Sequence, residues 1–279
     1  MLKLIAERLS QRGATVRFPE HATAMLPAGY RGRPQISDAP CAAECAACAD
    51  ACPTNAIVIR DGAVSLDLGC CLFCGECARV CPQEKISFTN DYRMAARRRE
   101  DLIVRAGVPY ALAAPYEDDR FRRSFRLRQV SAGGSGAEEA EINVLQTVVF
   151  DMARWGIQLV ASPRHGDAVV VTGPVTRAMK AALQITYDAM AAPKLVIAVG
   201  VSAISGGPWQ GENEATKERS NEATKERSNE ATKGAQVGGE ERAVLGGVNR
   251  LLDVDLFIPG FPPHPLTILD GLLRLIGRI

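Results

Sequence analysis

The distribution of cysteine constrains this chain more than any other feature of its 279 residues. All nine cysteines lie between Cys41 and Cys81, and the long segment after Cys81 has none. Many cysteines in a small secreted protein usually form disulfides, but the N-terminus MLKLIAERLS is too short and too charged for a secretory signal. The close spacing therefore predicts metal ligation rather than disulfide bonds.

The cysteines form two runs of similar spacing, each ending in Cys-Pro. The first run contains Cys41, Cys45, Cys48 and Cys52, and the second contains Cys71, Cys74, Cys77 and Cys81. This pattern resembles bacterial two-cluster ferredoxins, in which three closely spaced thiolates bind one [4Fe–4S] cubane and the fourth binds the other cubane. We therefore expect two [4Fe–4S] clusters, with these ligand sets: Cys41, Cys45, Cys48 and Cys81 for one, and Cys71, Cys74, Cys77 and Cys52 for the other.

Three features of the cysteine pattern leave alternatives. Paired CxxC sequences also bind zinc, although eight cysteines in duplicated order favour clusters. The first run has one extra residue at its first gap, within Ala42-Ala43-Glu44, which predicts an expanded loop. Cys70 is left over beside Cys71, and we interpret it as a spare thiol near the cluster rather than a ligand.

Composition and charge restrict the partners. The net charge is +1, so nucleic acid is not expected as a partner even though aromatic residues interrupt the basic run from Arg120 to Arg128. The alternation in that run is also typical of an edge strand or an extended arm. No apolar run reaches the roughly 18–20 residues of a membrane-spanning helix. We expect a cytoplasmic protein, attached to the cytoplasmic face of a membrane only through partner subunits.

The sequence divides into four parts. An N-terminal docking extension (1–35) begins with an amphipathic helix, and an α+β ferredoxin-like domain (36–92) follows, with short strands at 56–59 and 85–88. Residues 93–124 are expected to form a helical, basic linker, and the segment 90–105, which overlaps its start, is rich in helix formers. The Arg97-Arg98-Arg99 run is predicted to form a solvated or partner-facing helix face.

Residues 125–279 alternate between strands and helices. The apolar segments 158–161, 168–172, 194–200 and 255–258 predict strands, and 143–155, 174–190 and 266–279 predict helices. Buried strands separated by helices imply a parallel sheet covered on both faces. A highly charged insertion at about 210–240 repeats the sequence NEATKERS. With almost no apolar residues it is expected to be a tolerated surface expansion.

Several motifs in this second domain agree in order with one family. The segments Phe150–Ile157, Ala161–Asp167, Val171–Thr176 and the Pro259–Pro263 turn resemble the small subunit of group 4 [NiFe]-hydrogenases and the matching complex I subunit. Residues 1–92 resemble the two-cluster ferredoxin subunit of formate hydrogenlyase. The chain thus resembles a fusion of two neighbouring subunits. The resemblance implies a flavodoxin-like α/β fold docked on a large-subunit homologue.

The resemblance also implies a third cluster, which four cysteines of the second domain hold in the family. The corresponding positions in this chain are Ser135, Glu138, Ser202 and Phe261. Serine and glutamate are hard oxygen ligands that match a cubane poorly, and phenylalanine cannot ligate iron. We therefore expect this proximal cluster to be absent, with side chains such as Phe261 filling the site and the docking surface retained.

These observations predict an iron–sulfur electron-transfer subunit rather than a catalytic chain. The expected partners are a large-subunit homologue, other peripheral and membrane subunits, and a redox donor or acceptor protein. The alternative is a scaffold or assembly subunit that carries a soluble ferredoxin-type domain. The sequence contains no GxGxxG after a strand, no P-loop and no nucleophile–base set, so a self-contained enzyme is disfavoured.

Overall fold

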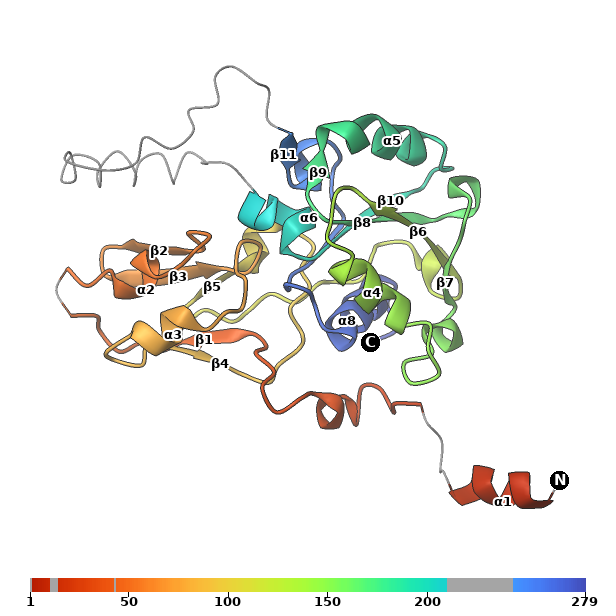
Figure 1. Cartoon of the computed structure of the whole chain (residues 1–279), viewed down its shortest axis with the longest axis horizontal. Helices are drawn as coiled ribbons and strands as arrows, with labels where there is room; N and C mark the ends of the chain where they lie inside the picture. The colour runs from red at the N-terminus through yellow and green to blue at the C-terminus, as the bar shows by residue number, and fades with distance from the viewer. Residues whose placement is uncertain (1, 11–14, 43, 210–242) are drawn as a thin grey trace.

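The computed structural model describes residues 2–10, 15–42, 44–209 and 243–279. The cysteine-rich part and the α/β part lie side by side, and helix α1 (Leu2–Ser10) stands apart from both (Figure 1). The NEATKERS insertion and Ala43 lie outside the described residues. Within those residues, no helix has the length and apolar character needed to cross a bilayer.

The cysteine-rich part contains two small antiparallel sheets and two short helices. One sheet pairs β1 (Pro34–Ile36) with β4 (Ile86–Phe88), and the other has the order β2-β3-β5. The remaining elements are β2 (Ile57–Arg60), β3 (Ala63–Asp67), β5 (Ile103–Arg105), α2 (Ala47–Asp50) and α3 (Glu76–Val80). β2 and β4 each begin soon after a Cys-Pro, as the sequence predicted. The two helices, α2 and α3, pack against each other.

The segment from 90 to 105 is not the helix that its composition suggested. It contains a 3₁₀ turn, η2 (Arg99–Leu102), which leads directly into β5. Its arginines have separate partners: Arg97 donates to the carbonyl of Asp255, and Arg99 donates two hydrogen bonds to Asp67. Pairing with β3 and these polar anchors outweigh helix propensity here. The arginine run is therefore not one helix face.

The same segment also joins the two parts of the chain. Ala96 forms an antiparallel bridge with Phe257, with reciprocal N–H to carbonyl hydrogen bonds of 3.0 and 2.9 Å. Ala96 and Phe257 belong to one buried cluster that also includes Leu66, Cys71, Val169 and Val196. A continuous apolar core therefore connects the cysteine-rich part to the sheet of the α/β part.

The α/β part is built on a parallel five-stranded sheet in the order β12-β10-β8-β6-β7. Its strands are β6 (Phe125–Ser131), β7 (Ile157–Leu159), β8 (Ala168–Thr172), β10 (Leu195–Val199) and β12 (Leu256–Ile258). Numbered along the chain, this is the 2-1-3-4-5 order of a flavodoxin-like fold. The parallel sheet confirms the predicted class. Two details differ: β6 is internal rather than an edge strand, and it begins only at Phe125.

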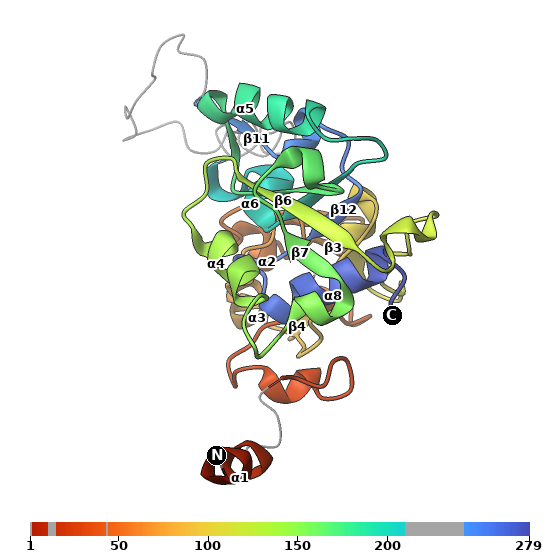
Figure 2. The same ribbon diagram turned by 90° about the vertical axis from the view of Figure 1, so that its right-hand side faces the viewer.

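Helices cover both faces of this sheet (Figure 2). Every residue of β8, β10 and β12 is buried, and alternate residues enter two separate cores. The helices are α4 (Ala137–Val144), α5 (Arg177–Asp188), α6 (Val201–Ser205) and α8 (Pro265–Leu275). The predicted helix 143–155 is wrong: α4 ends at Val144, and a 3₁₀ turn, η4 (Met152–Trp155), follows.

The remaining elements are short. A second two-stranded sheet pairs β9 (Val175–Thr176) with β11 (Val244–Gly246). The other 3₁₀ turns are η1 (Ala22–Met25), η3 (Asp119–Phe121), η5 (Pro163–His165), η6 (Gly207–Trp209) and η7 (Val248–Arg250). The N-terminal extension docks on the α/β part of its own chain. The N–H of Val16 donates to the carbonyl of Val149, and Phe18 is buried in the sheet core that also contains Phe125 and Leu266.

Helix α5 has a side-chain N-cap that can be tested directly. The hydroxyl of Thr176 accepts from the N–H of Met179 at 3.3 Å and donates to the carbonyl of Ala132 at 3.0 Å. Thr176→Ala should lower the free energy of unfolding by about 1 kcal/mol. Urea denaturation measures this loss. Thr186→Ala in the same helix is the matched control and should leave the stability unchanged, since the Thr186 hydroxyl only donates to the carbonyl of Ala182 within the helix. Equal losses would contradict a capping role.

Candidate iron–sulfur site

The two cysteine runs have the same local conformation. The residue before the second cysteine of each run has a positive φ, at Glu44 (58°) and Phe73 (55°). The third residue after each Cys-Pro cysteine is also left-handed, at Asn55 (53°) and Glu84 (48°). A non-glycine residue is uncommon there. Four such residues at matched positions indicate that one backbone arrangement occurs twice, despite the extra residue in the first run.

This conformation directs backbone N–H groups at the sulfur atoms. The N–H of Ala56 donates to Sγ of Cys52 at 3.2 Å, and the N–H of Lys85 donates to Sγ of Cys81 at 3.3 Å. These two bonds are equivalent, since each donor lies four residues after its cysteine. In the second run, Phe73 also donates to Sγ of Cys71 at 3.3 Å. Such donors stabilise negative charge on sulfur, as a metal-bound thiolate requires.

One of the two expected ligand sets lines a single pocket. Cys52, Cys71, Cys74 and Cys77 line one pocket together with apolar side chains that include Ile57, Leu66 and Phe88, and Cys74 is the exposed member of the four. Burial raises the pKa of Cys71, and neighbouring thiols add to the rise. Burial likewise raises the pKa of Cys77 to about 11, with Cys52 contributing next. Cys52 therefore lies with the second run, although it belongs to the first run in sequence.

The other expected set shows the same exchange. Burial raises the pKa of Cys48, and the thiols of Cys81 and Cys41 raise it further. Cys81 thus lies near the first run. Cys45 is half-buried on the turn before α2, where its N–H donates to the carbonyl of Ala42 at 3.1 Å. Within the described part of the chain, Cys41, Cys48 and Cys81 interact, and no direct interaction adds Cys45 to them.

Cys70 lies beside the second site in a polar setting. It is buried, and Nη2 of Arg99 lies 3.6 Å from its sulfur. The carbonyl of Cys70 accepts from the hydroxyl of Thr54 at 2.6 Å, and that hydroxyl lies 3.9 Å from Sγ of Cys52. Cys70 does not line the pocket that contains Cys71.

The described residues are compatible with a cubane. A [4Fe–4S] cubane takes one thiolate at each of four corners, so its ligands stay apart. Paired runs, sulfur-directed N–H groups and an apolar pocket are all compatible with this requirement.

The four positions that correspond to proximal-cluster ligands lie near the carboxyl ends of the sheet strands. Glu138 and Ser202 are buried, with 2% and 1% of their surfaces exposed, whereas Ser135 is exposed. Glu138 packs against Gly200, where an added Cβ would lie 2.7 Å from its Cγ. Phe261 is 36% exposed, and its ring lies 6.4 Å from that of Trp209. Phe261 is therefore an exposed side chain beside the indole and does not fill the site as the sequence predicted.

Sequence reasoning missed a second glutamate at this edge. Oε1 of Glu139 accepts from the hydroxyls of Thr172 (2.7 Å) and Ser131 (2.5 Å). It links the carboxyl ends of β6 and β8, which flank the point where strand order reverses and where ligands of such folds bind. Its other oxygen is buried without a hydrogen-bond partner in the described part of the chain. Only its place in the first turn of a helix could have indicated it.

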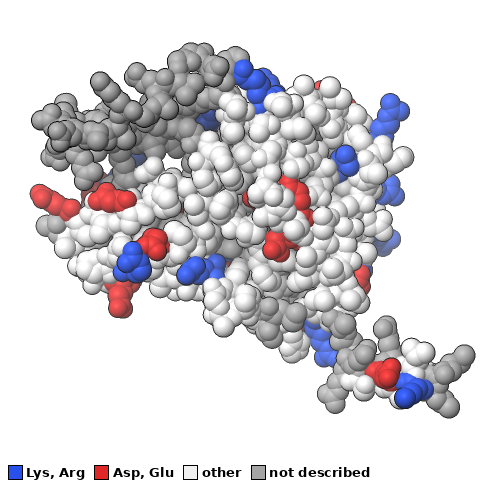
Figure 3. All heavy atoms as spheres, viewed as in Figure 1, with Lys and Arg blue, Asp and Glu red and all other residues white. Residues whose placement is uncertain are grey.

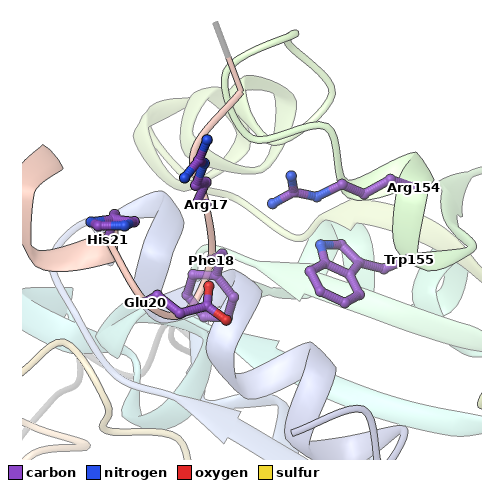
Figure 4. Close-up of a pocket in the computed structure, with 6 residues that line it drawn as sticks. All are labelled: Arg17, Phe18, Glu20, His21, Arg154 and Trp155. Carbon is purple, nitrogen blue, oxygen red and sulfur yellow. The ribbon is translucent and has the colours of Figure 1, made fainter. Parts of the chain in front are cut away.

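A separate open pocket lies between the N-terminal extension and η4 (Figure 4). Figure 4 shows Arg154 extending from η4 toward the extension, beside Trp155. Nη2 of Arg154 donates to the carbonyl of Val16 at 2.8 Å, and its guanidinium lies 5.1 Å from the centre of the Trp155 ring. These contacts hold the extension on the α/β part. We therefore interpret this pocket as part of the packing between the two segments.

Fold and site define the chain as a flavodoxin-like α/β domain joined to a cysteine-rich module. Comparison with known families agrees with this description, because the family of the NADH ubiquinone oxidoreductase 20 kDa subunit matches residues 136–275. The chain belongs to this family. The match begins after the last cysteine, so it does not test the predicted clusters.

Three relatives illustrate the range of the likeness. An NADH-quinone oxidoreductase subunit of Phocaeicola vulgatus is 37% identical over 131 residues, which cover 47% of this chain and 52% of that protein. Formate hydrogenlyase subunit 7 of Escherichia coli is 30% identical over 160 residues, covering 57% and 51%. An uncharacterized protein of Methanocaldococcus jannaschii is 30% identical over 157 residues, covering 56% and 86%. The chain spans about half the length of the first two.

Proposed function

We propose that this chain is an iron–sulfur electron-transfer subunit of a complex I-like or group 4 hydrogenase-like oxidoreductase. The observation that carries the proposal is the placement of Cys52 beside the second run and Cys81 beside the first, since this exchange is typical of two-cluster ferredoxins. When bound, the clusters would accept and donate single electrons. The chain's own residues supply thiolates, direct N–H groups at sulfur and exclude water with apolar side chains.

The α/β domain would dock this module on a large-subunit homologue of the same complex. The relatives from NADH-quinone oxidoreductase and formate hydrogenlyase support such a role, because the name of each denotes one subunit of a larger enzyme. On the face drawn in Figure 3, charged side chains form small separate groups on a mostly uncharged surface. We place the chain at the cytoplasmic face of a membrane, attached through its partners.

We also propose that the proximal cluster of the α/β domain has been lost. Residues 125–279 contain no cysteine. Of the four corresponding positions, Glu138 and Ser202 are buried among protein atoms, while Phe261 packs beside Trp209. Electrons would then leave the two clusters of the cysteine-rich part without passing through a third cluster at the carboxyl ends of the sheet strands.

Counting iron and acid-labile sulfide in the purified chain tests both statements. We expect about eight irons and two magnetically interacting clusters in the electron paramagnetic resonance spectrum after reduction, since each cubane holds four. About twelve irons would contradict the loss of the proximal cluster. Zinc without sulfide would contradict the whole proposal.

The alternative, a scaffold subunit with a soluble electron-carrier domain, predicts different behaviour in the cell. An affinity-tagged chain should co-purify with a large-subunit homologue if it belongs to a redox complex. Reduction of the chain by a partner without a stable large-subunit complex would favour the scaffold.

A further inference from the structure

We infer that the positive charge of Lys85 balances the negative charge of the cluster held by Cys41, Cys45, Cys48 and Cys81. This charge makes that cluster easier to reduce than the second cluster. This inference rests on the proposed iron–sulfur function. It starts from a buried cation. Only 5% of the surface of Lys85 is exposed, and lysine is almost never this buried unless its charge is balanced.

The described residues provide no carboxylate for this ammonium group. No ion pair among them involves Lys85, and its Nζ donates to the backbone carbonyl of Ala39. Asp38, Asp61 and Glu84 line the surface pockets that Lys85 also lines, yet none of the three forms an ion pair with it in the described part of the chain. One carbonyl oxygen does not offset the cost of burying a full charge. A negative group beside Lys85 would balance this charge, and a thiolate-ligated cluster supplies one.

Lys85 contacts Cys81 and the segment that leads into Cys41. Its backbone N–H donates to Sγ of Cys81, and its Nζ is held two residues before Cys41. The four thiolates carry more negative charge than the iron–sulfide core carries positive charge, and reduction adds one electron. A fixed cation in a poorly solvated site stabilises the reduced state more than the oxidised state, which raises the reduction potential.

The twofold repeat of the two runs gives an internal comparison. The residue equivalent to Lys85 is Ala56, which is buried and makes the same N–H to sulfur bond with Cys52. Two cations lie beside the second site. Arg99 is paired with Asp67 through two hydrogen bonds, and Arg31, which donates to the carbonyl of Phe73 at 3.5 Å, is exposed, so water screens its charge. The two sites therefore differ in one buried cation that has no carboxylate partner among the described residues. That difference gives the clusters unequal potentials and an order of reduction.

The test is a redox titration of the cluster-loaded chain, followed by electron paramagnetic resonance. Lys85→Gln keeps a donor for the Ala39 carbonyl but removes the charge, whereas Lys85→Arg keeps the charge. We expect K85Q to lower one of the two midpoint potentials while the other stays unchanged, and K85R to remain close to wild type. Arg60→Gln is the control, since Arg60 is exposed and lines a surface pocket with Lys85. Its loss should shift neither potential because water screens it.

Each outcome decides the inference. Loss of one cluster in K85Q but not in K85R would also support it, because assembly would then depend on the charge. Equal potentials in K85Q and wild type, with all irons retained, would overturn it and leave the proposed function intact. Loss of iron in both variants would also overturn it, in favour of a packing role. A wild-type chain without iron or sulfide would instead refute the proposed function itself.

Discussion

Cys77→Ala should remove about four of the eight expected irons and leave one intact cluster. Cys77 lies on α3, is 6% exposed and lines the pocket with Cys52, Cys71 and Cys74. With the proposed ligand set, alanine would leave one cubane corner without a ligand, because the three other sulfurs that line the pocket would serve the remaining corners. The first cluster should persist because none of its four ligands has changed. Iron and sulfide analysis gives the count, and the interaction between two paramagnets should disappear from the spectrum of the reduced chain.

The crossed ligand sets make a sharper prediction about pairs of variants. Cys52→Ala combined with C77A should lose no more iron than either single variant, because both residues serve one cluster. Cys81→Ala combined with C77A should lose nearly all iron, because the two residues serve different clusters. The opposite result would mean that each run binds its own cluster and that the exchange of the fourth cysteine does not occur.

Cys70 needs its own control, since it lies beside Cys71 and could supply a replacement sulfur. Cys70→Ala alone should retain about eight irons if Cys70 is not a ligand. Cys70→Ala combined with C77A should match C77A alone. A deeper loss in that pair than in C77A alone would show that Cys70 rescues the damaged site.

The fold was predictable wherever apolar pattern alone determines structure. The strands β8 and β10 are continuous apolar runs that are buried on both faces, and both were found at the predicted places. The helix expected from 143 to 155 was wrong because its apolar residues do not all face inward: Val148 is 64% exposed. The helix expected after Asn90 was wrong because long-range pairing of β5 with β3, which no local pattern reveals, fixes that segment as extended chain.

The candidate site was predictable in its sulfur atoms and not in its surroundings. Cysteine spacing led to eight ligand positions, which stay predictions until a cluster is measured. Lys85 was missed because a lysine in sequence is normally a solvated side chain. The one available signal was the comparison of the two runs, which place alanine and lysine at equivalent positions. Glu139 was missed because its partners, Ser131 and Thr172, come from two strands far apart in sequence.

Arg274→Met should cause a large loss of stability at neutral pH. Oδ2 of Asp270 accepts a hydrogen bond of 2.8 Å from Nε of Arg274, and Asp270 is only 1% exposed. Removing the guanidinium leaves a buried carboxylate without that partner, which costs about 3–5 kcal/mol. Urea denaturation should show this loss. Asp270→Asn in the same chain should recover much of it, and Arg123→Met, at an exposed position, should change stability by less than about 0.5 kcal/mol.

The loss in R274M should also depend on pH. Burial, the largest effect, raises the pKa of Asp270, and Arg274 and Arg93 oppose that rise. Without Arg274 the folded-state pKa should rise further above the unfolded value. A carboxyl with a raised folded pKa contributes stability below its unfolded pKa and loses it as pH rises through the folded pKa. The deficit of R274M should therefore be largest at neutral pH and shrink as the pH falls toward the ordinary carboxyl range. A deficit that is constant over this range would mean that Arg274 contributes packing rather than charge.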